Sequence, residues 1–238
     1  MALNFSSYVT TMSGLLSISP ETVLYPDNAG LTEAMIAYAE LRIYRELDFL
    51  VTVAEATTAD LTPGTRSVTV PGSIIIVNSA TLITPASTAP NAGTRNPLQR
   101  TSMEFINFFW PSVATTGIPS HYTMQDEETV ILAPTPAAAY RACFMGVVRP
   151  AALSVSNTTT YLTDFVPDLF VAASAIWGFG GINRNFGAAS DDPASALSWE
   201  QTYQNLKAGV DMENLRSKAW MPSWQPFSPS LGAKESRT

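Results

Sequence analysis

The sequence predicts an α+β fold: a discontinuous helical bundle, an inserted antiparallel β domain of sandwich or barrel-like form, and an extended C-terminal tail. Apolar residues recur at helical spacing towards both ends of the chain. Short β-branched runs separated by Pro-Gly pairs fill the middle. The two helical parts must pair across the insertion to bury their apolar faces. We therefore expect helical parts at 1–50 and 158–219, a β domain at 51–157 and a tail at 220–238.

The first strong helical pattern covers Leu31–Leu50. Its apolar side chains are spaced by three or four positions, at Ile36, Ala39, Ile43, Leu47 and Leu50. Gly30 precedes this helix and Thr32 can cap it. A shorter helix is expected over Val9–Leu16, and another should begin at Ser19, where proline and glutamate follow the capping serine.

The polar face of the 31–50 helix carries charges of both signs. Arg42 and Glu46 are four positions apart, so they can form an ion pair worth tenths of a kcal/mol. We predict that Arg42, Arg45 and Glu46 take part in binding a partner protein.

Four runs in the middle of the chain have strand character: Ser67–Val70, Ser73–Val77, Thr129–Leu132 and Tyr140–Val148. Turns are expected at Pro63–Gly64, at Pro71–Gly72 and over the acidic Asp126–Glu128. One short helix is expected over Thr101–Trp110, capped by Ser102 and with an apolar face of Phe105, Phe108 and Phe109. The stretch Thr84–Pro97 reads as a long loop.

Helical character returns after residue 157. Asp164 is expected to cap a helix that runs through Ile176 and ends at Gly178, Gly180 and Gly181. The last helix should start at Asp192–Pro193. Its expected apolar face consists of Trp199, Tyr203, Leu206, Val210 and Leu215.

The charge content is low for a lone soluble domain. Charged residues make up 14% of the chain and apolar residues 46%, whereas ordinary domains carry about 25% charged residues. Extensive contact with other protein explains this; secretion with glycosylation, or a lipid-facing surface, are alternatives. The longest charge-free apolar stretch with helical character, Leu169–Ile182, is too short to span a bilayer, and the N-terminus lacks the features of a secretory signal.

Charge and cysteine content restrict the function further. The net charge of −7 argues against non-specific binding to nucleic-acid phosphates. One cysteine, Cys143, cannot form a disulfide within the chain, which fits folding in a reducing cytoplasm.

Residues able to support catalysis or metal binding are scarce. The chain has one histidine, His121, and Cys143 lies in an apolar run typical of a buried inert thiol. Zinc would need more ligands, and the glycines of 178–187 fit no phosphate-binding motif. We expect no enzyme activity, cofactor or metal; a hydrolase using His121 is an alternative that an unaffected His121→Ala variant would exclude.

The tail alternates aromatic residues with prolines, which excludes a helix or an inner strand. Trp220, Trp224 and Phe227 either fold back on the chain's own core or dock on a partner, where tryptophan is a favoured anchor. We predict that this tail is a docking arm.

Three segments together resemble the head-to-tail adaptor proteins of tailed bacteriophages, the podophage family of tail tubular protein A. The helix 34–49 resembles the family's N-terminal helix. The stretch 119–140, in which a strand, an acidic turn, an apolar strand and Pro-Thr-Pro follow one another, resembles its hairpin. The stretch 158–176 resembles the helix that follows in the family.

The resemblance implies a structural protein of the virion at the head–tail junction, assembled in the host cytoplasm. Such proteins form a homo-oligomeric ring, typically dodecameric, between the portal protein and the tail nozzle protein. Genomic DNA passes through the ring during ejection without specific binding, and no membrane is involved. The alternative left open is a tail component whose β domain binds a receptor or carbohydrate.

Overall fold

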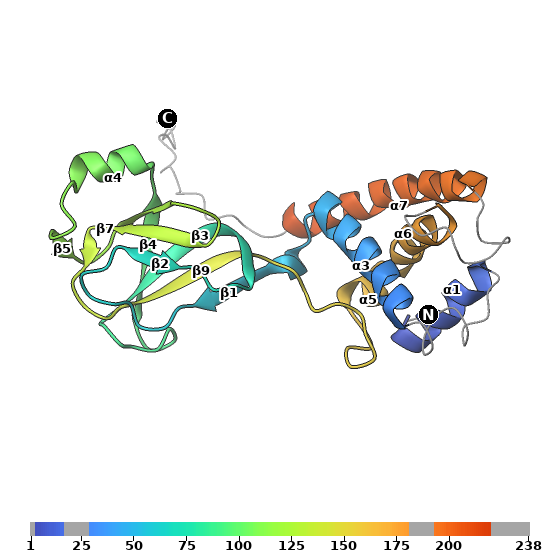
Figure 1. Cartoon of the computed structure of the whole chain (residues 1–238), viewed down its shortest axis with the longest axis horizontal. Coiled ribbons are helices and arrows are strands. Elements are labelled where there is room, and N and C mark those ends of the chain that lie inside the picture. Colours follow the sequence, from blue (N-terminus) through green and yellow to red (C-terminus); the bar gives the residue numbers. More distant parts are fainter. Residues whose placement is uncertain (1–2, 17–28, 181–192, 220–238) are drawn as a thin grey trace, which may run out of the picture.

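The chain folds into two lobes arranged end to end (Figure 1). The computed structural model describes residues 3–16, 29–180 and 193–219. One lobe contains helices from both ends of the chain, and the other contains the strands between them. The α+β class predicted from the sequence is thereby confirmed.

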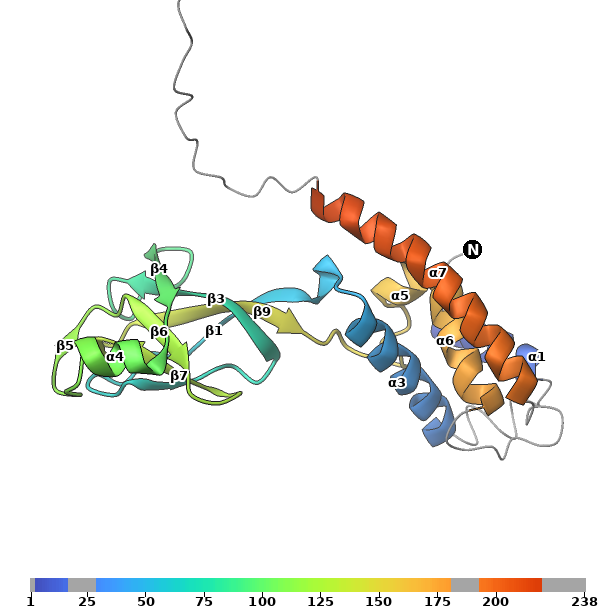
Figure 2. The ribbon, with the colours of Figure 1, turned by 90° about the horizontal axis from the view of Figure 1, so that it is seen from above.

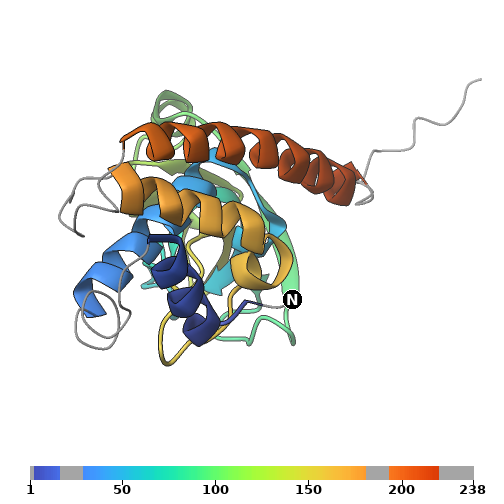
Figure 3. The same ribbon diagram turned by 90° about the vertical axis from the view of Figure 1, so that its right-hand side faces the viewer.

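The helical lobe packs around its central helix, α6 (Pro167–Gly180), which contacts α1 (Phe5–Leu16), α3 (Ala29–Glu46), α5 (Tyr161–Phe165) and α7 (Pro193–Ala219). Figure 3 looks onto this bundle and shows α6 between α7 and the two N-terminal helices. Buried α6 residues such as Phe170 and Ala173 lie in one core with Met12, Ile43 and Tyr203. Segments more than 120 positions apart in the sequence thus share one core, as predicted.

The helix expected over Leu31–Leu50 begins and ends earlier than predicted. It covers Ala29–Glu46, and only Leu50–Thr52 form a further short 3₁₀ turn, η1. Phe49 explains the early end, because it leaves the helix to bury its ring between Tyr44 and Tyr161. The predicted Thr32 cap is wrong, since Thr32 lies inside α3 and is buried.

The first helix is longer than predicted. α1 starts at Phe5 rather than Val9, because Asn4 and Ser7 cap it reciprocally: Ser7 N–H donates to Asn4 Oδ1, and Asn4 N–H donates to Ser7 Oγ. The helix expected from Ser19 lies outside the described residues.

The predicted Asp164 cap is also wrong, because two helices occupy this stretch. Thr160 precedes α5, where its backbone N–H donates to Thr163 Oγ1, and Asp164 lies within the helix. Pro167 is the first residue of α6. Proline suits this position because the N–H that it lacks would have no hydrogen-bond partner within the helix.

Gly178 and Gly180, at the end of α6, allow close packing against neighbouring helices. Gly178 and Gly180 both lie inside the helix. A Cβ on Gly178 would come within 2.7 Å of the Leu16 side chain in α1, and one on Gly180 would meet Ala196 in α7. Gly181 and the residues up to 192 lie outside the described part of the chain.

The last helix, α7, begins at Pro193 and buries much of its predicted apolar face. Tyr203 and Val210 are buried, and Trp199 and Leu206 pack against the core. Leu215 is 52% exposed, contrary to the prediction. Leu215 belongs to the last turns of α7, and this end of the helix extends past α6 towards the β lobe (Figure 2).

The β lobe is a curled seven-stranded sheet that resembles half a barrel. Its strand order is β1-β9-β3-β4-β6-β7-β2. The bounds are β1 Val53–Thr57, β2 Ser67–Thr69, β3 Ile74–Thr84, β4 Thr94–Arg100, β6 His121–Met124, β7 Thr129–Ala133 and β9 Arg141–Val148. Every pair is antiparallel except β4 with β6, so the sheet is mixed. Two short strands, β5 (Thr116–Gly117) and β8 (Thr135–Pro136), pair separately.

The segment that joins the two edge strands holds the curl in place. β1 and β2 are consecutive in sequence but lie at opposite edges of the sheet. Between them, Leu61 N–H donates to Tyr140 O, and Gly64 N–H donates to Pro136 O at the predicted Pro63–Gly64 turn. Gly64 has a φ of 82°, which favours glycine. The enclosed core contains Val68, Leu82, Tyr122, Leu132 and Phe144, with their neighbours.

Two predictions for the β region need correction. The loop expected over Thr84–Pro97 ends earlier, because Thr94–Arg100 form β4. This strand tolerates Pro97 because only the later residues Gln99 and Arg100 pair with β6. The sequence pattern did not indicate β1 as a separate strand, because no side chain of Val53–Thr57 is buried. The acidic turn is confirmed: Asp126 Oδ1 accepts the N–H groups of Glu128 and Thr129.

Two short stretches join the lobes, one leading into β1 and one leaving β9 (Figure 1). Within the described residues, no helix has the length and apolar character needed to cross a membrane.

Candidate functional site

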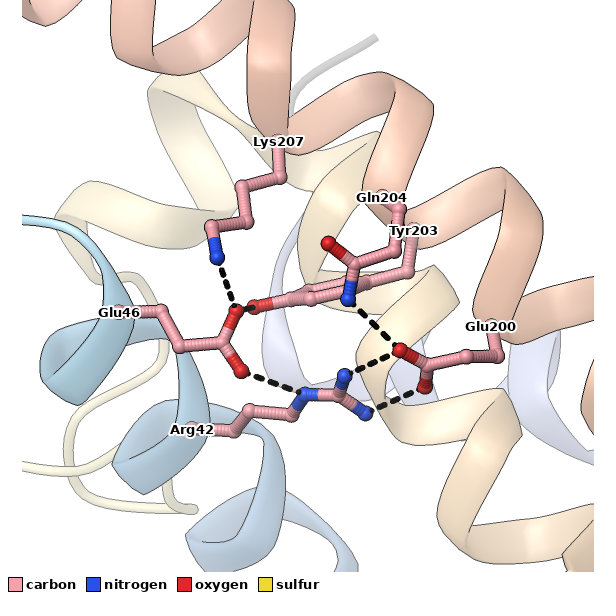
Figure 4. A network of polar contacts seen from close by, with 6 residues as sticks. All are labelled: Arg42, Glu46, Glu200, Tyr203, Gln204 and Lys207. Atoms are coloured by element: carbon pink, nitrogen blue, oxygen red, sulfur yellow. Dashed lines mark hydrogen bonds and ion pairs between the residues drawn. The ribbon is translucent and has the colours of Figure 1, made fainter.

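Arg42 is the centre of an ionic network that joins α3 to α7 (Figure 4). Its Nη1 and Nη2 donate to the two carboxylate oxygens of Glu200 at 2.8 and 2.6 Å. Its Nε donates to Glu46 Oε1 at 3.1 Å, which confirms the predicted pairing four positions apart. The guanidinium also lies over the ring of Tyr203, with Cζ 4.2 Å from the ring centroid.

Further α7 side chains complete this network. Lys207 Nζ lies 2.8 Å from Glu46 Oε2, and the Tyr203 hydroxyl donates to the same oxygen. Desolvation opposes ionisation of Glu46, but the bonds from Lys207 and Arg42 outweigh it and lower its pKa. The hydrogen bonds from Arg42 likewise lower the pKa of Glu200. Both acids therefore remain ionised at neutral pH and fix α7 on α3.

The partner-binding residues predicted on α3 differ in how accessible they are. Arg42 and Glu46 bond within the chain, as described, whereas Arg45 is exposed and forms no ion pair with the rest of the described chain. A shallow hollow of about 450 Å³ lies beside them, lined also by Tyr38 and Leu41. Contact of these residues with a partner stays a prediction.

A buried carboxylate lies at the connection between the lobes. Glu40 of α3 is 6% exposed, and its Oε1 accepts the backbone N–H of Leu153 at 2.9 Å. Leu153 belongs to the stretch that returns from β9 and is itself buried in the helical core. Desolvation raises the pKa of Glu40 to about 7, although the bond from Leu153 opposes the rise. The returning chain is thus fixed to α3 by a group that titrates near neutrality.

Helix α4 (Met103–Phe109) lies at the far end of the β lobe (Figures 1 and 2) and carries exposed aromatic side chains. Ser102 caps this helix as predicted, accepting the N–H of Phe105, and Ile106 is buried beneath it. The predicted apolar face points to solvent: Phe108 is 80% exposed, Phe109 56% and Phe105 37%. Trp110 and His121 extend the cluster, with their ring centroids 5.2 Å apart. We call Phe105, Phe108, Phe109, Trp110 and His121 the aromatic tip.

Arg66 holds the aromatic tip against the sheet. Its Nη2 donates to the carbonyls of Trp110 and Ser112 at 2.7 and 2.6 Å, and its Nε donates to Thr135 Oγ1. Thr135 in turn donates to Val113 O. The exposed rings are therefore carried by a fixed framework rather than by a free loop.

His121 and Cys143, the two residues considered for catalysis, lie on different strands, β6 and β9. His121 opens β6 and lies between the rings of Phe105 and Trp110, with Ser120 Oγ 2.8 Å from its Nδ1. Cys143 is buried in β9, near Thr57 Oγ1, as predicted. Among the described residues, no group of three or more His, Cys, Asp or Glu side chains could hold a metal ion.

The other predicted binding residues, Trp220, Trp224 and Phe227, lie outside the described residues. Sequence reasoning did not identify the aromatic tip as a surface, although a signal was present. Three phenylalanines and a tryptophan within 105–110 are more than one side of a seven-residue helix can bury. Glu200 carried no comparable signal, because its pairing with Arg42 depends on how α7 packs.

One comparison with known families matches almost the whole chain. The family model described as SU10 adaptor protein matches residues 13–227, which include both lobes. No curated protein matches the chain.

Proposed function

The chain belongs to the SU10 adaptor protein family, and from this premise we propose that it forms a ring that joins the portal to the tail nozzle and encloses part of the DNA ejection channel. Members of the family are structural adaptors of phages, so the protein is a virion component rather than a member of an enzyme class. The match over 13–227 carries the proposal, because it includes the helical lobe and the inserted β lobe together.

The shape and composition support this proposal. The two lobes lie end to end, so one subunit can contact different neighbours at its two ends (Figure 1). Only 14% of the residues are charged, which suits a chain with extensive subunit contacts. A closed ring of identical subunits needs a heterologous interface, in which two different surfaces of the subunit meet.

Within the ring, we assign the helical lobe to the wall and to the portal contact, with Arg45 the freest of the predicted contact residues. The β lobe faces outward or downward, towards tail proteins. The net charge of −7 suits a channel, because cationic walls would hold the DNA phosphates.

Co-purification with the portal protein tests the assignment. The full chain is expected to form rings that bind portal, and deletion of 220–238 is expected to weaken that binding. Arg45→Glu is expected to weaken it as well, while Arg216→Glu, a charge reversal in the last turn of α7, serves as the control. Unchanged portal binding in the deletion variant would contradict the docking role of the tail.

The exposed aromatic tip keeps one alternative open, in which the β lobe of a tail component binds a receptor or carbohydrate. Negative-stain microscopy separates the two functions. Rings, alone or on portal, support the adaptor, whereas monomers or trimers that bind host-cell surface glycans support the alternative.

A further inference from the structure

The aromatic tip is an apolar surface that the described chain leaves uncovered. Phe108 and Phe109 are 80% and 56% exposed, and Val113 and Ile118 on the following loop are 53% and 57% exposed. Arg66 holds this loop in place, so the exposure does not result from a loose segment. A fixed cluster of exposed aromatic rings indicates a docking surface.

A groove and a negative charge adjoin the tip. The groove has a volume of about 460 Å³ and is lined by Met103 of α4, Arg66, Val113 and Ile131, among others. Gln125 also lines the groove and is followed directly by the acidic turn Asp126–Glu128. An occupant of this surface should therefore offer aromatic or proline side chains for the tip and positive charge for the turn.

The chain's own segment 220–238 has this composition in the same order. Trp220, Trp224 and Phe227 alternate with prolines, and Lys234 and Arg237 follow them. Proline-rich segments bind aromatic-lined surfaces in extended form. The length also suffices: the seven positions from Phe227 to Lys234 can span roughly 22 Å of extended chain, more than the roughly 10 Å that β6 covers from His121 to Met124 before the acidic turn.

Trp220 and Trp224, the two tryptophans of the 220–238 segment, cannot readily reach the tip of their own chain. Residue 218 is fixed near the lobe junction, where Lys218 Nζ lies 2.8 Å from Asp48 Oδ2. The tip lies at the other end of the β lobe (Figures 1 and 2), beyond the length of β9, whose eight residues span roughly 26 Å. Trp224, five positions beyond Ala219, reaches at most about 18 Å from it. A neighbouring subunit is under no such restriction.

We infer that the segment 220–238 of one subunit docks on the aromatic tip of a second copy, with its tryptophans on Phe105, Phe108 and Phe109 and its basic end at the acidic turn. The inference rests on the proposed ring and identifies the neighbouring subunit as the partner of the predicted docking arm. The arm then links neighbouring subunits, and its deletion weakens portal binding by weakening the ring.

Disulfide cross-linking between two full-length variants tests the contact. One variant carries Phe108→Cys and the other Trp224→Cys; the native Cys143 is buried and stays unreactive. After mixing and mild oxidation, trypsin cleavage should give residues 101–141 joined to residues 219–234. The matched control replaces Phe108→Cys with Phe165→Cys, which removes another exposed phenylalanine (69% exposed) from the helical lobe. The tip variant should link at least about tenfold more than the control, because docking raises the effective concentration.

Two results would overturn the inference. One is the lack of specific linking, in which the Trp224→Cys variant links equally to the Phe108→Cys variant and the Phe165→Cys control or links to neither. The other is linking only within a single chain, in dilute protein carrying both Phe108→Cys and Trp224→Cys. Microscopy of the same samples distinguishes failure of the arm contact from failure of the proposed function. Rings without the specific link contradict only the arm contact. Absence of rings, with or without portal, contradicts the proposed function.

Discussion

At the scale of single residues, the carboxyl group of Glu40 makes the joint between the lobes sensitive to pH. Its pKa is about 7 in the folded chain, because burial disfavours the charged form. Between its ordinary value of 4.5 and about 7, the folded state binds more protons than the unfolded state. The stabilising contribution is therefore complete below pH 4.5 and is lost as the pH rises through about 7.

Replacing Glu40 with glutamine should remove this dependence. Glu40→Gln keeps an oxygen that can accept the Leu153 N–H but cannot ionise. We expect the variant to be more stable than the parent at pH 8 by about 2 kcal/mol, with the difference shrinking towards pH 5. Urea unfolding across this pH range measures it. Glu33→Gln, an exposed change on the same helix, is the control, and an equal effect there would contradict this account.

Arg42 should stabilise the chain through geometry as well as charge. Lysine at this position keeps the positive charge but loses the two-pronged bond to Glu200 and the contact with the Tyr203 ring. Arg42→Lys is therefore expected to lower the free energy of unfolding by about 1 kcal/mol. Arg45→Lys should change it by less than about 0.5 kcal/mol. Equal losses in urea denaturation would mean that the network contributes only net charge.

At the scale of elements, periodicity predicted the type of most helices and strands but not their ends. The apolar spacing of α3 and α7 follows from which side faces α6, so it was visible in the sequence. The end of α3 depends on the burial of Phe49 against Tyr161, a residue more than a hundred positions away. The strand β4 was hidden because its composition is that of a loop, and its pairing with β3 overrides that preference.

Gly146 tests the close approach of β9 to β3. A Cβ at this position would collide with the backbone carbonyl of Ile76, beside an irregularity in the β3–β9 register. Gly146→Ala should therefore destabilise the β lobe by about 2 kcal/mol or more, measured by chemical denaturation. Gly72→Ala in the same lobe, where the added methyl group meets no atom within 4 Å, should be nearly neutral. Comparable stability of the two variants would show that β3 moves away freely.

At the scale of the whole molecule, the fold explains how one subunit can have separate contact surfaces. The helical core requires both ends of the inserted β segment to return to it, and the bond between Leu153 and Glu40 fixes the returning stretch to α3. The aromatic tip lies at the opposite end of the β lobe (Figure 1). The sequence indicated the inserted β domain and the scarcity of catalytic groups. It could not show that Arg42 pairs with Glu200 or that the phenylalanines of α4 face solvent, because both depend on packing between distant segments.

The central claim is that this chain builds a ring at the portal. Its most direct test is negative-stain microscopy of the full-length protein, alone and mixed with its portal protein, together with the mass of the particles in solution. The account predicts closed rings, dodecameric by resemblance to other adaptors, that stack coaxially on portal. Particles that remain monomeric or trimeric in the presence of portal would contradict it.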